Sequence, residues 1–442
     1  MDSKEFYLSQ FNRYHANGAK RSPRWLSELR ESAMATFQER GFPTLHDEDW
    51  RYTNLDRITS VPFAISRGDA KPVSSDVVAD LAGADLECNR LVFVNGRYDA
   101  RLSAVKGLAP GIRIENLGAL LDANDDFLES RLGRYARIPE NPFMALNTAL
   151  MTDGALVVVP KNCRLETPLH LIYVSVANGA PVASYPRNLL VFEAGSEAQV
   201  VENYIGLNGG TYFANAVTEL IAEEGASVEH YRLEREAGSG SHIGALEARI
   251  QRNCNFTAHA ITLGGGLVRN DVHAVLAGEG SECTLNGLYL LDDDQHLDNS
   301  TEIEHVQPRA TSLELYKGIL TGSARGVFNG KILVHKDAQK TNARQTNKNL
   351  LLSPNAVVNT KPQLEIHADD VKCSHGSTIG ELDRDALFYL RSRGIGMGEA
   401  RSLLSYAFAN EVVARVRVEY LRRRLDDYLL NKLGRIQNPV LQ

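Results

Sequence analysis

The sequence predicts a mainly β protein, in which a parallel β-helix core is flanked by an N-terminal and a C-terminal helical region. Short runs rich in Val, Ile, Leu, Phe and Tyr recur between about residues 90 and 380, and many alternate apolar with polar residues, as strands do. The turns between these runs return at a regular interval. Before and after this part of the chain, apolar residues fall at helical spacing instead.

The interval is clearest in the middle of the chain. The segments "EAGSEAQVVE", "EEGASVEHYR", "RNCNFTAHAI" and "GEGSECTLNG" each place a small turn before an alternating run. Their turn residues, Gly195, Gly225, Asn253 and Gly280, lie 30, 28 and 27 residues apart. Such a period indicates a solenoid, whose coils contact only their neighbours. Because no helical pattern lies between these strands, a parallel β-helix is favoured over the alternative of a β-sandwich with irregular loops.

The chain therefore divides into three parts. Residues 1–89 form an N-terminal helical region, where the apolar residues of "RSPRWLSELRESAMATFQERG" have helical spacing and Gly41 ends the helix. Residues 90–380 form the β-helix core, with a helical insertion near 115–150. Residues 381–442 form a C-terminal helical domain.

One face of the C-terminal domain has two interpretations. Leu404, Phe408 and Val412 are four residues apart and share a helix face, with several arginines nearby. This face either packs on the protein itself, or docks a partner protein. The sequence leaves both open.

Composition excludes several classes of function. The net charge of −7 over 442 residues argues against nucleic-acid binding, which needs a basic face. No run of about 18 apolar residues is present, so no membrane span is expected, and the polar start lacks the apolar centre of a signal peptide. The cysteines are odd in number and scattered, which suits a reducing cytoplasm better than a disulfide framework: Cys88, Cys163, Cys254, Cys283 and Cys373.

Catalytic motifs are mostly absent from the sequence. Without a G-x-x-x-x-G-K-[ST] motif, the chain is not expected to hydrolyse ATP alone. The acidic stretch at residues 292–298 offers one enzymatic alternative, a two-carboxylate hydrolysis of polysaccharide on a β-helix. The competing interpretation is that Asp292, Asp293 and Asp294 form a solvated turn.

The pair Cys373 and His375 is the candidate metal site. Both residue types bind soft or borderline metals, and on a strand residues two apart point to the same face. The structural alternative is a buried small cysteine and a histidine bonded to a neighbouring strand.

Longer stretches resemble a known family. Three stretches resemble the SufB/SufD family of iron–sulfur cluster assembly proteins: "PTLHDEDWRYTNL", "NPFMALNTALMTDGALVVVPKN" and "QLEIHADDVKCSHG". The last of these lies within residues 297–412, the most diagnostic part, and resembles the SufD branch of the family. The resemblance covers nearly the whole chain. One departure is His367, where a tyrosine is more usual.

This resemblance implies a right-handed parallel β-helix and a non-catalytic scaffold subunit. It implies a complex with a SufB-like paralogue, which would pair through the β-helix ends, and with a SufC-like ATPase, docked by residues 381–442. A homodimer is implied for the isolated chain. The complex would assemble nascent clusters, acquire iron and pass clusters to apoproteins. Whether reduced flavin binds the complex is left open.

The resemblance also implies that His375 is a ligand of iron or of a transient cluster at the interface with the paralogue, with Cys373 as a second candidate. Iron–sulfur clusters generally need about four protein ligands. The sequence offers two here, so the others are expected from the partner chain. The remaining alternative is a purely architectural subunit without a ligand role.

Overall fold

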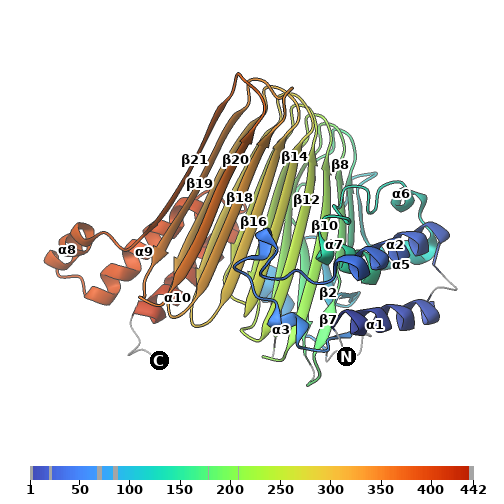
Figure 1. Ribbon diagram of the computed structural model, residues 1–442, viewed down its shortest axis with the longest axis horizontal. Helices are drawn as coiled ribbons and strands as arrows, with labels where there is room; N and C mark the ends of the chain where they lie inside the picture. Colours follow the sequence, from blue (N-terminus) through green and yellow to red (C-terminus); the bar gives the residue numbers. More distant parts are fainter. Residues whose placement is uncertain are drawn as a thin grey trace.

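The protein is a parallel β-helix wound from two sheets, with helices at both ends (Figure 1). The computed structural model describes residues 3–18, 22–66, 72–82, 88–177, 179–207 and 209–437; parts of the predicted regions 1–89 and 381–442 lie outside these ranges. Within the described ranges, no helix is long and apolar enough to cross a membrane.

The first sheet carries most of the even-numbered strands of the solenoid. Its strands are, in spatial order, β20 (Val357–Ile366), β18 (Arg325–Val334), β16 (His296–His305), β14 (Leu267–Leu276), β12 (Gly240–Ile250), β10 (Tyr212–Ala222), β8 (Arg187–Phe192), β5 (Ala155–Val159) and β4 (Arg113–Asn116), with β7 (Val182–Ser184) and β1 (Ala64–Ile65) at its side.

The second sheet carries most of the odd-numbered strands of the solenoid. It contains β21 (Lys372–Gly380), β19 (Asn342–Leu351), β17 (Thr311–Leu320), β15 (Glu282–Leu291), β13 (Asn255–Thr262), β11 (Ser227–Arg235), β9 (Glu197–Leu207), β6 (Leu169–Val176), β2 (Arg90–Val94) and β3 (Arg97–Tyr98).

From β8 onward the chain alternates between the two sheets, so each strand pairs with the strand two further along. Ser227, for example, is paired in parallel with Glu197 in one neighbouring coil and with Asn255 in the other. Only the short strands β3 and β4 pair antiparallel. This topology confirms the predicted parallel β-helix and excludes the β-sandwich alternative.

The predicted turn residues form a column along one corner of the solenoid. Gly195, Gly225, Asn253 and Gly280 all have positive φ, between 54° and 71°, a conformation that glycine and asparagine adopt most readily. The N–H of each donates to a carbonyl in the following coil, as from Gly195 to Glu224 at 2.9 Å. The column also includes three turn residues outside the predicted series, Asn162, Arg309 and Lys340.

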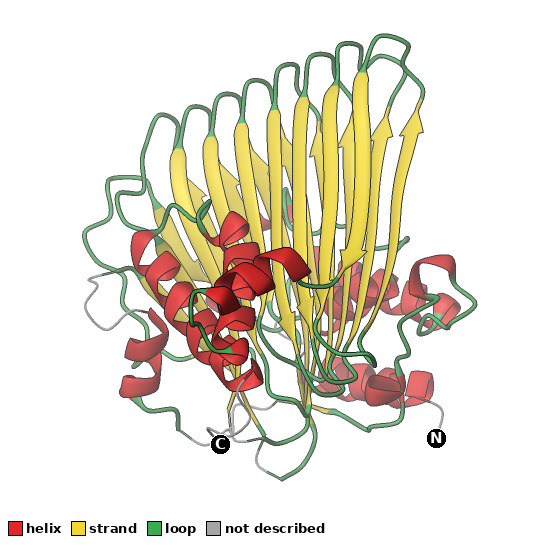
Figure 2. Ribbon diagram, turned by 90° about the vertical axis from the view of Figure 1, so that its left-hand side faces the viewer, coloured by secondary structure: helices red, strands yellow, loops and turns green. Residues whose placement is uncertain are grey.

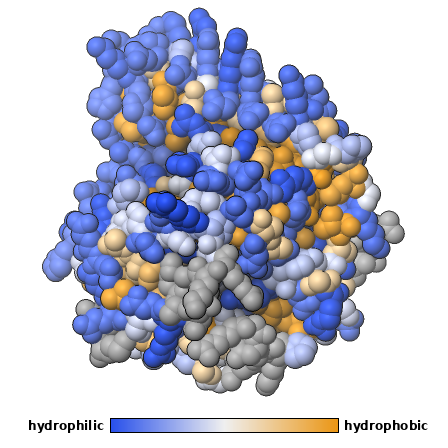
Figure 3. All heavy atoms as spheres, turned by 90° about the vertical axis from the view of Figure 1, so that its right-hand side faces the viewer, coloured by the Kyte–Doolittle hydropathy of each residue, from blue (hydrophilic) through white to orange (hydrophobic). Residues whose placement is uncertain are grey.

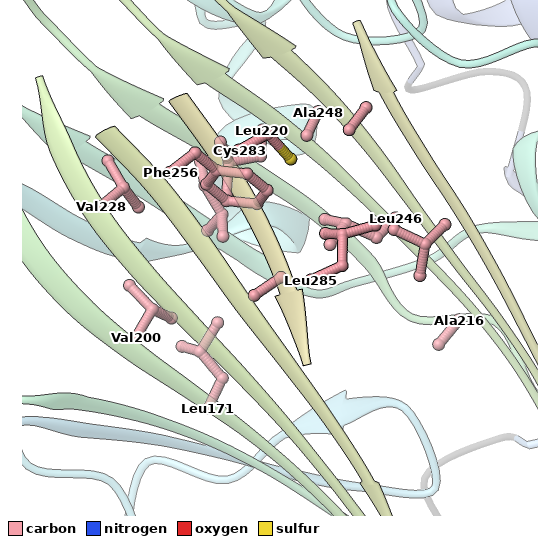
Figure 4. Close-up of a cluster of buried hydrophobic side chains, with 14 of the residues drawn as sticks. Leu171, Val200, Ala216, Leu220, Val228, Leu246, Ala248, Phe256, Cys283 and Leu285 are labelled. Atoms are coloured by element: carbon pink, nitrogen blue, oxygen red, sulfur yellow. The ribbon is translucent and has the colours of Figure 1, made fainter. Parts of the chain in front are cut away.

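The space between the sheets holds the main hydrophobic core. Apolar side chains from successive coils stack in rows that face one another across the lumen (Figure 4). The second sheet contributes Leu171, Val200, Val228, Phe256 and Leu285, and the first sheet contributes Ala216, Leu220, Leu246 and Ala248. Burial of this continuous surface stabilises coils that have no separate cores of their own.

Helices close the N-terminal end of the solenoid. They are α1 (Ser3–Gly18), α2 (Arg24–Arg40), α3 (Asp56–Thr59), α4 (Ser75–Ala82), α5 (Leu117–Ala123), α6 (Asp126–Glu129) and α7 (Pro142–Leu150), with a short 3-10 helix η1 (Glu48–Trp50). The side chain of Asn141 caps α7 by accepting from the N–H groups of Phe143 and Met144. The outer face at this end shows hydrophobic side chains gathered among hydrophilic ones (Figure 3).

Residues 44–57, here called the strap, run along the outer face of the first sheet (Figure 1). The Trp50 ring lies 3.9 Å from the Arg269 guanidinium carbon on β14. The Thr53 hydroxyl donates to Asp298 on β16 at 2.5 Å, and Glu48 pairs with Lys361 on β20. The strap therefore ties the N-terminal region to the last coils.

Three helices follow the solenoid, α8 (Arg384–Ser392), α9 (Met397–Val413) and α10 (Glu419–Gln437). Helices α9 and α10 pack against the outer face of the second sheet, where Val412, Leu425 and Leu429 join one buried cluster with Tyr231 and Leu288. Helix α8 lies beyond the last coil and has no buried residues (Figure 1).

Candidate functional site

The last coil of the solenoid is open on one side. Strands β20 and β21 end their sheets, and each pairs with only one neighbour within the described residues. Figure 2 looks onto this end: the C-terminal helices lie across its lower part, and the upper part of the strands is uncovered. The free edges are about ten residues long, and edges of this kind readily pair with another chain.

Cys373 and His375 lie on β21 and share the face directed towards the lumen. Cys373 is half-buried against an apolar cluster that includes Ile332 and Ala343. Two residues beyond His375, the Ser377 hydroxyl donates to Thr360 on the opposite sheet at 2.8 Å. His375 lies between these two contacts in sequence and is exposed. The structure therefore brings the predicted pair together at the open mouth of the β-helix.

The two side chains differ in chemical state. Burial raises the pKa of the Cys373 thiol above its ordinary value, against a smaller opposing effect of the hydrogen bond from the Ala343 backbone. Since the thiolate is the metal-binding form, Cys373 is less ready than an exposed cysteine to bind metal in the free chain. The imidazole of His375 is exposed.

A polar row lies directly beneath His375 inside the lumen. The strand register pairs His375 with Gln345 on β19, and Gln345 with Glu314 on β17. The Gln345 amide donates to the Glu314 carboxylate at 2.8 Å. Burial raises the pKa of Glu314 to about 7, although its hydrogen bonds act in the other direction. Neither residue was predicted from the sequence, where the one available signal was a charged residue at an inward position of an otherwise apolar run.

No complete metal site is formed by the described part of the chain. None of its groups of three or more His, Cys, Asp or Glu side chains is arranged to hold a metal ion. Next to His375, a side chain on Gly376 would meet no atom within 4 Å. The outer face of β21 beside the pair is therefore open in the isolated chain.

The acidic stretch does not form a hydrolytic pair. Asp294 makes an ion pair with Arg57 of the strap at 2.8 Å, and Asp292 with Lys432 of α10 at 3.4 Å. Asp298 is fully buried beside Arg269. Because these carboxylates are used in contacts between elements, the polysaccharide alternative finds no support here.

Three other histidines in the late coils have local partners. His305 is buried in the lumen with its Nε2 2.9 Å from the Ser312 hydroxyl. His335 lies 2.6 Å from Glu304, and exposed His367 lies 3.3 Å from Glu365.

The three residues of the predicted docking face differ in burial in the isolated chain. Val412 is fully buried against the second sheet, and Phe408 is half-buried beneath the Lys317 ammonium, 3.9 Å from its ring centre. Of the three, Leu404 is partly exposed. The interpretation that this face packs on the protein itself is therefore the right one for Val412. Exposed apolar residues lie on all three C-terminal helices, with Leu403 on α9 40% and Leu430 on α10 48% exposed. The most exposed are on α8, where Phe388 is 75% and Tyr389 is 57% exposed.

Comparison with known proteins places the chain in a family. The family described as "SUF system FeS cluster assembly, SufBD core domain" matches residues 174–408, and "SufBD protein N-terminal region" matches residues 1–171. The chain is 33% identical over 414 residues to the iron–sulfur cluster assembly protein SufD of Escherichia coli, covering 93% of each chain. It is 34% identical over 410 residues to an iron–sulfur cluster assembly SufBD family protein of Synechocystis, covering 90% of this chain and 89% of that protein.

Fold and site together define a parallel β-helix protein with an open end that carries a Cys–His pair. A SufD protein of Bacillus subtilis is also similar over its length, at 27% identity and 97% coverage of both chains. The chain belongs to the SufBD family of iron–sulfur cluster assembly proteins, which confirms the family resemblance found in the sequence.

Proposed function

We propose that this chain is a SufD-like scaffold subunit that helps to assemble nascent iron–sulfur clusters with a SufB-like paralogue and a SufC-like ATPase. The observation that carries the proposal is the position of Cys373 and His375 on the uncovered last strand. Iron or the growing cluster is the substrate here, and the scaffold contributes ligands rather than catalysis.

The pair acts as half of a shared site. His375 is the principal ligand, because its imidazole is exposed and binds metal in its neutral form. Cys373 is the secondary ligand, because its raised pKa disfavours the thiolate. The remaining ligands come from the paralogue. The open space around Gly376 leaves room for the backbone of that partner to approach.

The free edges of β20 and β21 are the surface for the paralogue. Their backbone groups are unpaired on one side, and a second β-helix end pairs with them by strand addition. The same edges allow two copies of this chain to form a homodimer when the paralogue is absent.

The ATPase docks on the C-terminal helices, at the exposed residues of α8. Phe388 and Tyr389 are large apolar side chains on a helix that buries none of its own residues, and such exposed groups mark interaction sites. Since the chain has no phosphate-binding loop motif, ATP hydrolysis enters through this partner.

A purely architectural subunit is the second candidate. It is favoured by the packing of Cys373 against Ile332 and Ala343, which accounts for the cysteine without any metal. The two candidates differ in what they require of His375, since an architectural subunit needs only the strand edges.

The test is the iron and acid-labile sulfide content of the co-expressed, anaerobically purified three-protein complex. Wild type is compared with His375→Ala, with His367→Ala as the matched control, because His367 is also exposed but follows the opposite sheet. We expect His375→Ala to give an intact complex without cluster and His367→Ala to match wild type. Unchanged cluster content in an intact His375→Ala complex would leave the architectural role as the answer.

A further inference from the structure

We propose that Glu314 and Gln345 are positioning residues for His375: Glu314 orients the Gln345 amide, and Gln345 presents its carbonyl oxygen to a ring N–H of His375. This contact fixes the imidazole tautomer and leaves the other ring nitrogen for iron. The inference rests on the proposed ligand role of His375 and adds the two buried residues that prepare it.

The three residues form one row across three successive coils. Glu314, Gln345 and His375 occupy equivalent register positions on β17, β19 and β21. Neighbouring parallel strands lie about 4.8 Å apart, so side chains at these positions stack directly on one another. Below Glu314 the row continues with Leu285, which is apolar and fully buried. The polar part of the row therefore begins at Glu314 and leads only towards the open end.

The hydrogen bond within the row orients the Gln345 amide, with its oxygen left on the side of the open end. Glu314 and Gln345 are each 1% exposed. The Gln345 Nε2 group donates to Glu314 at 2.8 Å, so the amide nitrogen is directed inward. Among the described residues, the Gln345 Oε1 atom is buried and has no hydrogen-bond partner. A buried carbonyl oxygen without a partner is costly, and the next side chain in the row that can donate to it is His375.

The opposite sheet leaves space for this amide. Gly330 lies on β18 with an alpha carbon that faces the row, and a side chain there would come within 2.4 Å of Gln345 Nε2 and 2.7 Å of the Phe328 ring. Any side chain at this position would require the Gln345 amide and the Phe328 ring to move. The Gln345 side chain is thereby confined by the backbone of the opposite strand.

The chemical consequence concerns the free imidazole. A histidine that binds metal through one nitrogen almost always donates its other N–H to an acceptor, which fixes the ring orientation and raises its basicity as a ligand. His375 is exposed, and the row supplies this acceptor from inside the same chain. The ligand is then arranged before any partner chain or iron arrives, which reduces the ordering cost of forming the shared site.

The first experiment reads the tautomer directly. Full-length protein labelled with ¹⁵N-histidine is analysed by long-range ¹H–¹⁵N correlation, and the His375→Gln variant identifies the His375 signals among the 12 histidines. We expect a single tautomer of His375 in wild type and an exchange-averaged pair of nitrogen shifts in Gln345→Leu. Glu314→Leu is expected to have the same effect in smaller degree, because Gln345 loses its anchor.

Ser377→Ala is the matched control, since Ser377 shares the strand and face of His375 but bonds to Thr360. It should leave the His375 shifts unchanged. If Gln345→Leu does not fold, as judged by the signals of the other histidines, Gln345→Met replaces it. Identical His375 nitrogen shifts in wild type and the folded Gln345 variant would overturn the proposal.

A second readout connects the row to metal binding. In the three-protein complex, loss of an outer partner of a metal-binding histidine typically weakens affinity about 10- to 100-fold, so Gln345→Leu should require that much more ferrous iron for half-loading. Unchanged loading would also count against the row. The tautomer measurement needs neither partner nor iron. It therefore tests the positioning role of Glu314 and Gln345 separately from the proposed function. A failure of the proposed function would be seen instead in the cluster content of the His375→Ala complex.

Discussion

The two ends of the solenoid solve the problem of unpaired strand edges in opposite ways. At the N-terminal end, β5 and β2 are covered by the short antiparallel strands β4 and β3, and helices pack around them. At the C-terminal end, β20 and β21 pair with no further strand within the described residues, and their upper part is uncovered. Natural proteins usually shorten or cover such edges to avoid aggregation. A long free edge at only one end therefore supports the proposal that another chain covers this surface.

The closed end is expected to carry the largest stability effect. Arg187 is fully buried and bonds to Glu219 at 2.6 Å, and it also donates to Asn147 and Thr148 of α7. Arg187→Ala leaves Glu219 as a buried, unpaired charge, which typically costs about 3–5 kcal/mol. Chemical denaturation should show this loss as a lower midpoint, whereas His375→Ala at the open end should remain within about 0.5 kcal/mol of wild type. Equal losses at both ends would contradict the comparison.

The lumen near the open end should be sensitive to acid. Burial lowers the pKa of His305 to about 4, below the value of about 6.5 for an unfolded chain. The unfolded state then binds more protons, so this stabilisation is complete above pH 6.5 and is lost as the pH falls from about 6.5 to 4. At pH 5 one such histidine costs about 2 kcal/mol. Denaturation of wild type and His305→Gln at pH 7 and pH 5 should show the smaller loss in the variant; an equal loss would assign the acid sensitivity elsewhere.

Two glycines close to the candidate site provide a matched pair. At Gly330 a new Cβ atom meets the Phe328 ring at 2.7 Å, while at Gly376 it meets nothing within 4 Å. Gly330→Ala should cost about 1–3 kcal/mol by overpacking, and Gly376→Ala should be neutral or slightly stabilising in the isolated chain. Thermal unfolding of both variants checks this prediction. A destabilised Gly376→Ala monomer would show that the outer face of β21 is packed by the chain itself.

The smallest stability effect is expected on α8. Phe388 is 75% exposed, so Phe388→Ala should change the free energy of unfolding by less than about 0.5 kcal/mol. Capture of the co-expressed ATPase should nevertheless fall, because the proposed docking side chain is removed. Leu429→Ala on α10 is the contrasting variant: it is fully buried and should cost about 2–5 kcal/mol. Undiminished ATPase capture by Phe388→Ala would remove α8 as the docking surface.

Much of this architecture could be predicted from the sequence, because the solenoid repeats a local rule. Each coil needs a turn residue with positive φ. Four of these residues can be recognised in the sequence because glycine and asparagine adopt this conformation readily: Gly195, Gly225, Asn253 and Gly280. The column continues through Arg309 and Lys340, which do not look like turn residues in sequence. Hydrogen bonds between coils stabilise them in this conformation, and that support comes from the stack rather than from the residue itself.

The candidate site could be predicted only in part. Cys373 and His375 are two apart on a strand, so their common face follows from strand geometry. Glu314 and Gln345 could not be placed with them, because which residues stack across coils depends on the strand register, and the repeat length varies from coil to coil. Val412 was ambiguous for a related reason: helix periodicity shows that a face is apolar without showing what covers it.

The strap also sets an order on how the protein can be built. Glu48 contacts Lys361, which lies 313 residues further along the chain. During synthesis, the strap leaves the ribosome long before the coils that receive it exist, and it can settle only after β20 has been made. The coils can form one after another from local contacts, whereas this final closure joins distant parts of the chain and is entropically the most demanding contact. The strap can contact β20 only once the last full coil of the first sheet has formed. Its bound position would therefore distinguish complete chains from chains truncated before β20.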